Sequence, residues 1–457
     1  MHAAERLAAW SAGLRHAEIP AEVTAAAKLH LLDAVGTGLA ALALDEMPAA
    51  RAVAAELGGP QEASALGVGR RLGAAAAALA NGTLMHALDF DDTHELAIVH
   101  SSVVVAATVL AVGEASGASG EELVTAAVGG YEISARIGLA APGRLHVKGF
   151  HPTSVCGVFA AAAVAARLRG LSAEQTANAL GIAGSQASGL MEYLADGSQT
   201  KPLHAGWAAH AGIVAAALAA HGASGPASVL EGRFGLLASH VDEFDAAALT
   251  AALGERWETP AIAFKLYPCC HAGHAVLNAA EASGLTAVDP EEVEEVVARV
   301  AGEVAVGLVL EPAERKLAPA SAYEAKFSLP YCIGALLAHG SLGVDAFTAE
   351  AIADPATLRL AALVSYEVAE FADGNEFSGG IRARAGGRAY EASVPRPRGG
   401  PASPVAPEEI HAKFLRNAGL ALPVAEAERL LAALEGLERH PAAELASLLP
   451  AGPNYLT

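Results

Sequence analysis

Long runs of alanine and leucine, separated by glycine and proline, fill this 457-residue chain from its start to about Gly254. Alanine and leucine are the strongest helix formers, and aromatic residues, which favour strands, make up only 5% of the chain. The pattern predicts a large helical domain. Its expected helices are Ala21–Leu44, Gly73–Met85, Gly120–Leu139, Thr153–Leu168, Ser172–Gly189 and Leu203–His221.

The pattern changes after Pro260. Val293–Val304 is rich in β-branched residues and predicts a strand, and the two alternating segments on either side of Gly386-Gly387 predict a β-hairpin. Helices are expected at Glu324–His339, at Phe347–Ala353 and, after a proline-rich linker, within Pro407–Leu449. We therefore predict a mostly α fold, in which an all-helical domain (residues 1–264, with 398–457 returning to it) carries a smaller inserted α+β lid domain (residues 265–397).

The charge of the chain restricts its partners. It has 29 basic and 50 acidic residues, a net charge of −21, which argues against a nucleic acid or an anionic membrane as the main partner. The start lacks a basic segment followed by an apolar run, and the apolar stretches Ser102–Val112 and Ala205–Ala220 are too short to span a bilayer. Four cysteines do not make a disulfide framework. We expect a soluble cytoplasmic protein.

One polar segment stands out in this apolar chain. Between His86 and Ser102, which includes the run HALDFDDTH, the sequence places four carboxylates and three imidazoles. Ionisable groups in an apolar matrix need partners, and such clusters are where pKa values are adjusted for chemistry. A helix cap would explain one acid but not the histidines. We therefore interpret this segment as part of an active site.

Three further segments carry candidate functional residues, each with a simpler alternative. His151 precedes a proline at a helix entry, where Thr153 or Ser154 could cap the helix and an anion could bind, but a packed histidine is equally consistent. Lys201 lies before a very apolar helix and needs a negative partner, unless it is at the surface. Tyr331 could donate a proton or be an ordinary core residue.

A metal centre is the alternative at the domain junction. Cys269, Cys270, His271 and His274 include zinc-binding residue types, but adjacent cysteines ligate one ion poorly, and no three well-spaced cysteines suggest an iron–sulfur cluster. We predict no metal and no cofactor.

In combination these segments resemble the MmgE/PrpD family, whose members include 2-methylcitrate dehydratase, cis-aconitate decarboxylase and iminodisuccinate epimerase. The matching segments run in family order over nearly the whole chain: HALDFDDTH, GYEISARIG, GFHPTSVCG, TKPLHAGWAAHAG, KLYPCCHAGH and EAKFSLPYC. The resemblance implies a helical domain plus an α+β lid, a homodimer, and a site between the domains that needs no metal or organic cofactor. The implied site residues are Asp89, Thr93, His100, His151, Lys201, Lys265 and Tyr331.

Within this set we expect Asp89, His100, His151 and Tyr331 to be catalytic. The expected substrate-binding residues are Thr93, Lys201, Lys265 and His274. Two departures concern the branch of the family. Decarboxylase members carry a histidine where this chain has Cys270, and the Trp-containing insert typical of the dehydratase branch is absent. The segment EAKFSLPYC is similar to the epimerase branch.

The chemistry that the resemblance implies is formation of a carbanion or enolate next to a carboxylate. Lysines can hold carboxylates and stabilise negative charge, and imidazoles can move protons near neutral pH. The leading hypothesis is a cofactor-independent lyase, a dehydratase of a small di- or tricarboxylate such as 2-methylcitrate, citrate or aconitate. An epimerase, a decarboxylase, and a silent helical dimer that binds a dicarboxylate or a metal are the alternatives.

Overall fold

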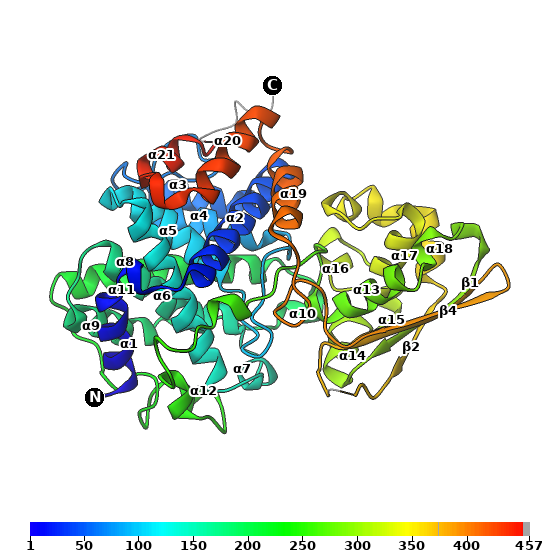
Figure 1. The fold of residues 1–457 in the computed structure, drawn as a ribbon, viewed down its shortest axis with the longest axis horizontal. Helices are drawn as coiled ribbons and strands as arrows, with labels where there is room; N and C mark the ends of the chain where they lie inside the picture. Colours follow the sequence, from blue (N-terminus) through cyan, green and yellow to red (C-terminus); the bar gives the residue numbers. More distant parts are fainter. Residues whose placement is uncertain (373, 451–457) are drawn as a thin grey trace.

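The computed structural model describes residues 1–372 and 374–450. These residues have two main hydrophobic cores. One core draws on residues from Ala4 to Phe264 and again from Ile410 to Leu449, and the other on residues from Tyr267 to Ala385. The two cores correspond to the two lobes of Figure 1, which we call the helical domain and the α+β domain. The described residues are mostly helical and include one small sheet, as the sequence predicts.

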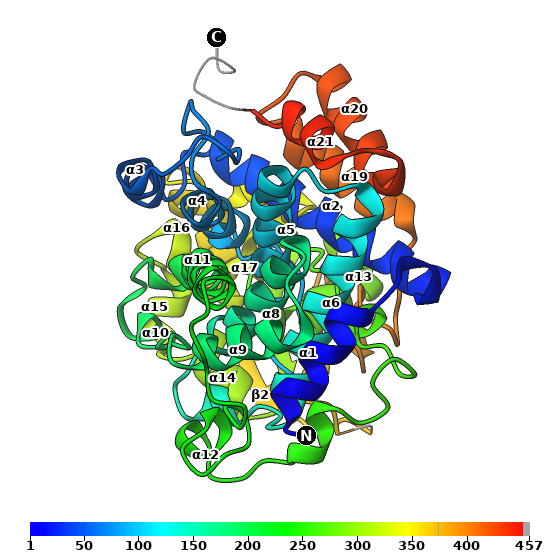
Figure 2. The same ribbon diagram turned by 90° about the vertical axis from the view of Figure 1, so that its left-hand side faces the viewer.

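Helices pack on all sides of α8 in the helical domain (Figure 2). Every residue of α8 except Arg167 is buried, and α5, α6, α9 and α11 contact it. The helices of this domain are α1 (Ala3–Gly13), α2 (Ala21–Ala43), α3 (Pro48–Leu57), α4 (Ala74–Ala87), α5 (Ser102–Ser116), α6 (Gly120–Leu139), α7 (Arg144–Val147), α8 (Pro152–Leu168), α9 (Ala173–Gly184), α10 (Tyr193–Asp196), α11 (Thr200–Ala220), α12 (Leu236–His240), α19 (Pro407–Ala418), α20 (Val424–Glu435) and α21 (Ala442–Ser447).

Small residues allow these helices to approach closely. A Cβ atom on Gly206 of α11 would lie 2.2 Å from the carbonyl oxygen of Leu79 in α4, so only glycine fits there. Two helices, Ala21–Ala43 and Thr200–Ala220, are long and apolar enough to cross a membrane by length and composition. Burial of 72% and 56% of their most apolar windows shows that much of this apolar surface packs inside the domain.

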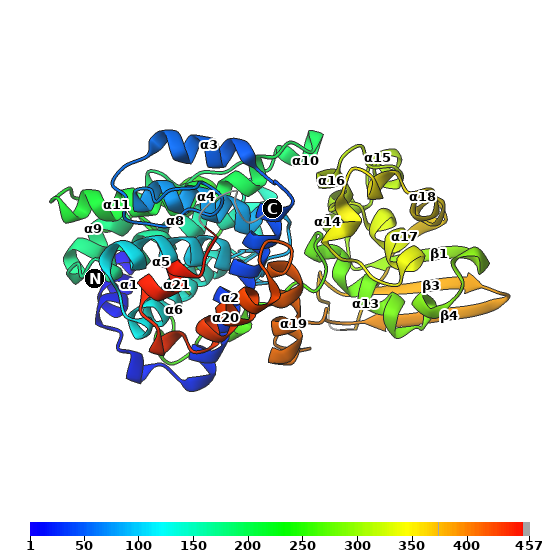
Figure 3. The ribbon, with the colours of Figure 1, turned by 90° about the horizontal axis from the view of Figure 1, so that it is seen from above.

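The α+β domain contains one four-stranded sheet of order β2-β1-β3-β4. Strand β1 pairs in parallel with β2 and antiparallel with β3, and β3 and β4 form the predicted hairpin around Gly386-Gly387, both of which have positive φ. The hairpin points away from the helical domain (Figure 3). The elements are α13 (His274–Ala282), β1 (Val293–Val300), α14 (Glu303–Val309), α15 (Ala313–Leu317), α16 (Ala322–Ala325), α17 (Leu329–His339), α18 (Pro355–Ala361), β2 (Val364–Val368), β3 (Gly379–Ala385) and β4 (Arg388–Val394).

Two helices predicted in this domain differ in the structure. The expected helix Glu324–His339 is divided into α16 and α17, because Ser328 caps a new helix through the Tyr331 amide and Pro330 belongs at a helix start. The expected helix Phe347–Ala353 is replaced by two short 3₁₀ turns, and the Thr348 hydroxyl accepts the Ala351 amide between them.

The chain returns to the helical domain through α19. This helix packs against α2 on the side that faces the α+β domain (Figures 1 and 3). The C-terminal segment predicted as helical thus supplies three helices to the first core.

Candidate active site

A cavity lies between the two domains, and both contribute to its walls. Its empty volume is about 760 Å³ including the open mouth. Apolar side chains, among them Met191 and Phe327, line much of it, and these two also belong to a small hydrophobic cluster that joins the domains. Its polar and ionisable lining comprises Asp89, Thr93, His100, His146, His151, Tyr193, Lys201, Lys265, Cys270, His271 and Glu376.

Two lysines share one carboxylate at the base of this cavity. The Lys201 Nζ lies 2.5 Å, and the Lys265 Nζ 3.0 Å, from the same Oδ1 atom of Asp89. The Lys265 ammonium also donates to the Asp89 backbone oxygen at 3.1 Å. All three side chains are buried, and the second carboxylate oxygen, Oδ2, has no hydrogen-bond partner among the residues that the structure describes. One negative and two positive groups leave this Asp89 cluster (Asp89, Lys201, Lys265) with one excess positive charge.

The backbone around Asp89 places the cluster. Asp89 has φ of 51°, in the left-handed region, which Asp and Asn adopt more readily than most residues. Thr93, a few residues on, pairs through both backbone hydrogen bonds with Ala263, each at 2.8 Å. This bridge ties the HALDFDDTH segment to the strand-like segment that carries Lys265, 176 positions later.

The three aspartates of the segment have different partners. Asp89 binds the lysines, whereas Asp91 Oδ1 lies 3.0 Å from His86 Nδ1. Asp92 accepts the amide of Ser102 at the start of α5 and also lies 3.1 Å from His30 Nδ1. Helix capping therefore explains Asp92. Asp91 orients a histidine, and Asp89 holds the two lysines.

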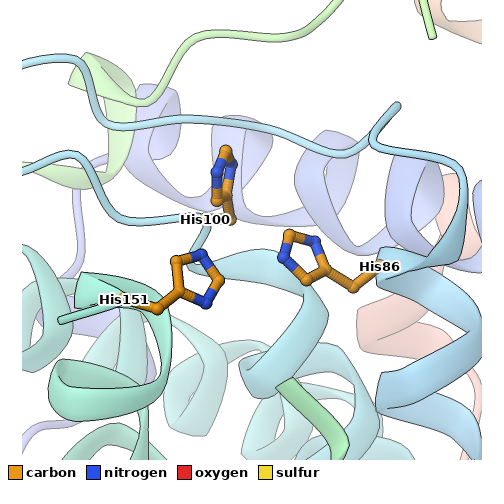
Figure 4. Close-up of side chains that lie close together, drawn as sticks. All are labelled: His86, His100 and His151. Atoms are coloured by element: carbon orange, nitrogen blue, oxygen red, sulfur yellow. The ribbon is translucent and has the colours of Figure 1, made fainter. Parts of the chain in front are cut away.

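Three histidines lie together, and two of them, His100 and His151, line the cavity (Figure 4). His86 ends α4, His100 precedes α5, and His151 precedes α8. The Nδ1 of His100 lies 2.6 Å from the Asp92 backbone oxygen, so it must carry the proton and leave Nε2 with its lone pair. The His151 Nδ1 lies 3.1 Å from the Nδ1 of His204. Ring nitrogens of the three histidines lie within 4.8 Å of one another, so this set could also ligate a metal ion.

Burial and charge set the protonation of this site. Burial opposes ionisation of Asp89, but the two lysines outweigh it and hold the Asp89 pKa well below its usual range. Burial, reinforced by the lysines, lowers the pKa of His100 well below its usual value, and burial and His86 do the same for the pKa of His151. The site therefore combines a charged aspartate with neutral imidazoles at neutral pH.

The structure brings together six of the eight residues predicted from the sequence. Asp89, Thr93, His100, His151, Lys201 and Lys265 line the cavity. The negative partner of the lysines in this structure is Asp89 rather than a substrate. Thr153 and Ser154 lie inside α8 instead of capping it, and the Thr153 hydroxyl accepts the His100 amide at 3.0 Å.

Tyr331 and His274 do not line this cavity. The Tyr331 hydroxyl donates to the Ala346 carbonyl at 2.5 Å, and the side chain packs in the core of the α+β domain against Phe347. The structure thus places Tyr331 where the sequence analysis had the alternative of an ordinary core tyrosine. The His274 Nε2 lies 3.2 Å from the Cys269 backbone oxygen, and the neighbouring His271 faces the cavity instead.

Sequence reasoning missed the cavity residue Tyr193 and two histidines that lie beside His151, namely His86 and His204. His86 is the first residue of the HALDFDDTH segment and one helical turn from Asp89, so this spacing could have indicated it. Tyr193 lies in a segment without regular periodicity and gave no signal. His204 follows Lys201 by three residues, one turn along α11, which again is a usable spacing.

A second buried ion pair lies behind the cavity. The Lys413 Nζ on α19 lies 2.7 Å from Asp33 Oδ1 on α2. It also donates to the backbone oxygens of Phe90 at 2.7 Å and Lys265 at 2.9 Å. This Asp33 pair (Asp33, Lys413) therefore joins the segments that carry Asp89 and Lys265, although it does not line the cavity.

Comparison with known proteins identifies the family. The MmgE/PrpD N-terminal domain matches residues 5–249, and the MmgE/PrpD C-terminal domain matches residues 267–439. The chain therefore belongs to the MmgE/PrpD family, as its motifs indicate. The second match continues through α19 and α20, which in the structure pack in the core of the helical domain.

Several curated relatives are similar over part of the chain. The cis-aconitate decarboxylase-like protein oryM of Aspergillus oryzae is 33% identical over 287 residues, which are 60% of this chain and 59% of that protein. Cis-aconitate decarboxylase of Aspergillus terreus is 30% identical over 287 residues, 60% of this chain and 58% of that protein. Cis-aconitate decarboxylase of Mus musculus is 33% identical over 307 residues, which are 64% of this chain and 60% of that protein. The similarity thus spans about three fifths of each relative.

Proposed function

We propose that this protein is a lyase that acts on a small di- or tricarboxylate, without a metal or organic cofactor, and that its first candidate reaction is dehydration. The observation that carries the proposal is the Asp89 cluster, with its excess positive charge, beside neutral histidines in one cavity. A small polycarboxylate carries the opposite charge and fits a cavity that both domains enclose.

The lysines account for binding. Lys201 is 5% exposed and faces the cavity, with its ammonium 5.0 Å from the centre of the Phe327 ring. A substrate carboxylate can share this ammonium with Asp89, since an ammonium has three donors. Each charge-assisted bond of this kind contributes about 1.5–3 kcal/mol.

The histidines account for proton transfer. His100 and His151 are neutral at neutral pH, because their pKa values are lowered, and the bare Nε2 of His100 can accept a proton from the carbon next to a substrate carboxylate. The resulting enolate is stabilised by a nearby lysine. The imidazolium formed then gives its proton to the leaving hydroxyl, so that water departs and the histidine returns to its neutral form.

Decarboxylation is the second candidate. The curated relatives are named cis-aconitate decarboxylases or cis-aconitate decarboxylase-like. Loss of CO₂ leaves a carbanion that a protonated histidine must quench, so this reaction needs an acid where dehydration needs a base. The neutral resting state of His100 and His151 favours dehydration, and the same first step followed by reprotonation on the other face would give epimerisation.

Incubation with citrate, 2-methylcitrate, cis-aconitate and iminodisuccinate in D₂O, followed by NMR, separates these reactions. We expect an unsaturated acid from a hydroxy acid, with deuterium at the abstracted position in the reverse direction. Release of CO₂ from cis-aconitate would instead establish decarboxylation, and deuterium exchange with inversion would establish epimerisation. Tight binding of all four acids without exchange or turnover would contradict an enzymatic role.

A further inference from the structure

The three-histidine cluster (His86, His100, His151) has a feature that proton transfer does not require. All three side chains are buried, and one ring nitrogen from each lies within 4.8 Å of the others (Figure 4). Proton transfer in the proposed reaction uses His100 and His151. His86 does not line the cavity and is left without a role in that reaction.

The free nitrogen of each ring can be assigned from its hydrogen bonds. Each Nδ1 already has a partner: Asp91 for His86, the Asp92 carbonyl for His100, and His204 for His151. A carboxylate and a carbonyl can only accept, so Nε2 holds the lone pair in His86 and His100; in His151 it does so in the tautomer whose Nδ1 donates to His204. The Nε2 atoms of His86 and His151 are buried and have no hydrogen-bond partner among the described residues. Leaving two buried nitrogens unpaired is costly unless something binds there.

We propose that the three-histidine cluster binds one divalent transition-metal ion of the zinc type, with a water or a substrate oxygen as fourth ligand, and that this ion inhibits the enzyme. Three imidazoles and one open position form a zinc coordination set. Metal-bound histidines donate their other N–H to a carboxylate or a backbone carbonyl, as His86 and His100 do here. Inhibition rests on the proposed function, because the metal occupies the lone pairs that would accept the proton.

The local charges permit a cation despite the two lysines. Lys201 and Lys265 both bind Asp89, and Asp91 lies 3.0 Å from the ring of His86 on the other side. All three protein ligands are nitrogens, so magnesium and calcium, which prefer oxygen, are excluded. Tetrahedral zinc with bonds of about 2.0–2.1 Å needs ligand nitrogens about 3.3–3.4 Å apart, so binding must rotate the rings toward one another.

Zinc binding can be measured without any substrate. The full chain, stripped with a chelator, is titrated with Zn²⁺ in competition with a chromophoric indicator, and Co²⁺ is added separately for its visible absorption spectrum. We expect one ion per chain and, with Co²⁺, the intense bands of a tetrahedral site. No binding, or only octahedral Co²⁺ bands, would overturn the proposal.

Variants locate the ion. His86→Asn should lower Zn²⁺ affinity at least 100-fold, and Asp91→Asn, which removes an orienting partner, should lower it about 10- to 100-fold. The matched control is His210→Asn on α11, where the ring bonds the Ala75 carbonyl outside the cluster, and it should leave affinity unchanged. Loss of binding in Cys270→Ser/His271→Asn, with His86→Asn unaffected, would place the ion at the domain junction and overturn the proposal.

Measurements of turnover test the inhibition separately from the binding of zinc. With an active preparation, Zn²⁺ should reduce turnover and a chelator should restore it, in competition with the polycarboxylate. Turnover that is insensitive to Zn²⁺ at concentrations that fill the site would contradict inhibition but leave the lyase proposal standing. Zinc binding by a chain that turns over no polycarboxylate would contradict the lyase proposal but not the metal site.

Discussion

Two buried lysine–carboxylate groups lie close together in this protein, and they differ in openness and in charge balance. The Asp33 pair has one lysine for one carboxylate, and the Lys413 ammonium is further used by two backbone oxygens. The Asp89 cluster has two lysines for one carboxylate and faces a cavity. The first arrangement is complete in itself, whereas the second has a charge that a ligand can use.

The pKa values follow the same division. Burial raises the pKa of Asp33 and lowers that of Lys413, so each partner is shifted toward its neutral form. In the Asp89 cluster burial is outweighed, because the lysines lower the pKa of Asp89 and Asp89 raises the pKa of Lys201. Similar residues thus form a structural tie in one place and a charged site in the other.

The largest expected effect lies on the cavity side. His100→Ala should lower kcat about 10²- to 10⁴-fold, the usual contribution of a positioned general base, with the fold intact by circular dichroism. His210→Ala, away from the cavity, is the matched control and should turn over like the wild type. A wild-type kcat in His100→Ala would mean that the cavity beside the Asp89 cluster is not the place of the reaction, so that the Asp89 cluster would differ from the Asp33 pair in its charge balance but not in a catalytic role.

Breaking the Asp33 pair should affect stability instead of turnover. Lys413→Met leaves Asp33 buried without its cation, which should lower the free energy of unfolding in urea by about 3–5 kcal/mol. The double variant Asp33→Asn/Lys413→Met should lose less than Lys413→Met alone, because no unpaired charge remains.

Lys148→Met, at an exposed ion pair with Asp242, is the control and should change the unfolding free energy by less than about 1 kcal/mol. An equally small loss of unfolding free energy in Lys413→Met would show that the Asp33 pair does not stabilise the fold.

Removing one lysine from the Asp89 cluster should weaken substrate binding more than it weakens the fold. In Lys201→Met the Asp89 carboxylate keeps Lys265 at 3.0 Å, so the loss of stability should be well below that of Lys413→Met. The KM for the polycarboxylate should rise about 10- to 100-fold, as expected for loss of one charge-assisted bond. Unchanged affinity by calorimetry together with early unfolding would mean that both groups are structural.

The last effect concerns acid, which acts gradually over a range of pH. His100, His151 and His204 have pKa values lowered by burial, that of His204 to about 4, so the folded protein holds these rings neutral. Their contribution to stability is complete above the unfolded value of about 6.5 and is lost as pH falls through the folded values. The free energy of unfolding should fall between pH 7 and 5, by up to about 1.4 kcal/mol per pH unit for each group, as measured by urea unfolding at each pH.

His204→Asn should make this slope shallower, whereas His210→Asn should not. The same slope in both variants would show that the His204 ring is not held neutral by the fold.

The sequence predicted the helical elements well because their signals are local. The helix expected within Ser172–Gly189 forms as α9, which starts with a capping box of Ser172 and Gln175, and the Gly386-Gly387 hairpin forms as expected. Membership of the MmgE/PrpD family was also readable from the motifs. The helices that failed, at Glu324–His339 and Phe347–Ala353, did so where a serine or threonine side chain made a local hydrogen bond to the backbone.

Only the site residues that lie within the sequence motifs could be predicted. Asp89 and His100 stand out because they are polar in an apolar region. The pairing of Asp33 with Lys413 joins residues 380 positions apart and has no local signal. The position of Tyr331 in the core of the α+β domain could not be predicted, because α17 is buried on nearly every side and no periodicity shows which face meets the cavity.

The long-range contact of Lys413 has a consequence for how the protein is made. The Asp89 turn and the Lys265 segment are both held by an ammonium that the ribosome adds much later, on α19. A nascent chain that ends before this helix has synthesised both segments of the candidate site but lacks one of the groups that hold their backbones. Folding of the helical domain therefore cannot finish during translation of its first 264 residues, and the α+β domain must emerge while that domain is still incomplete.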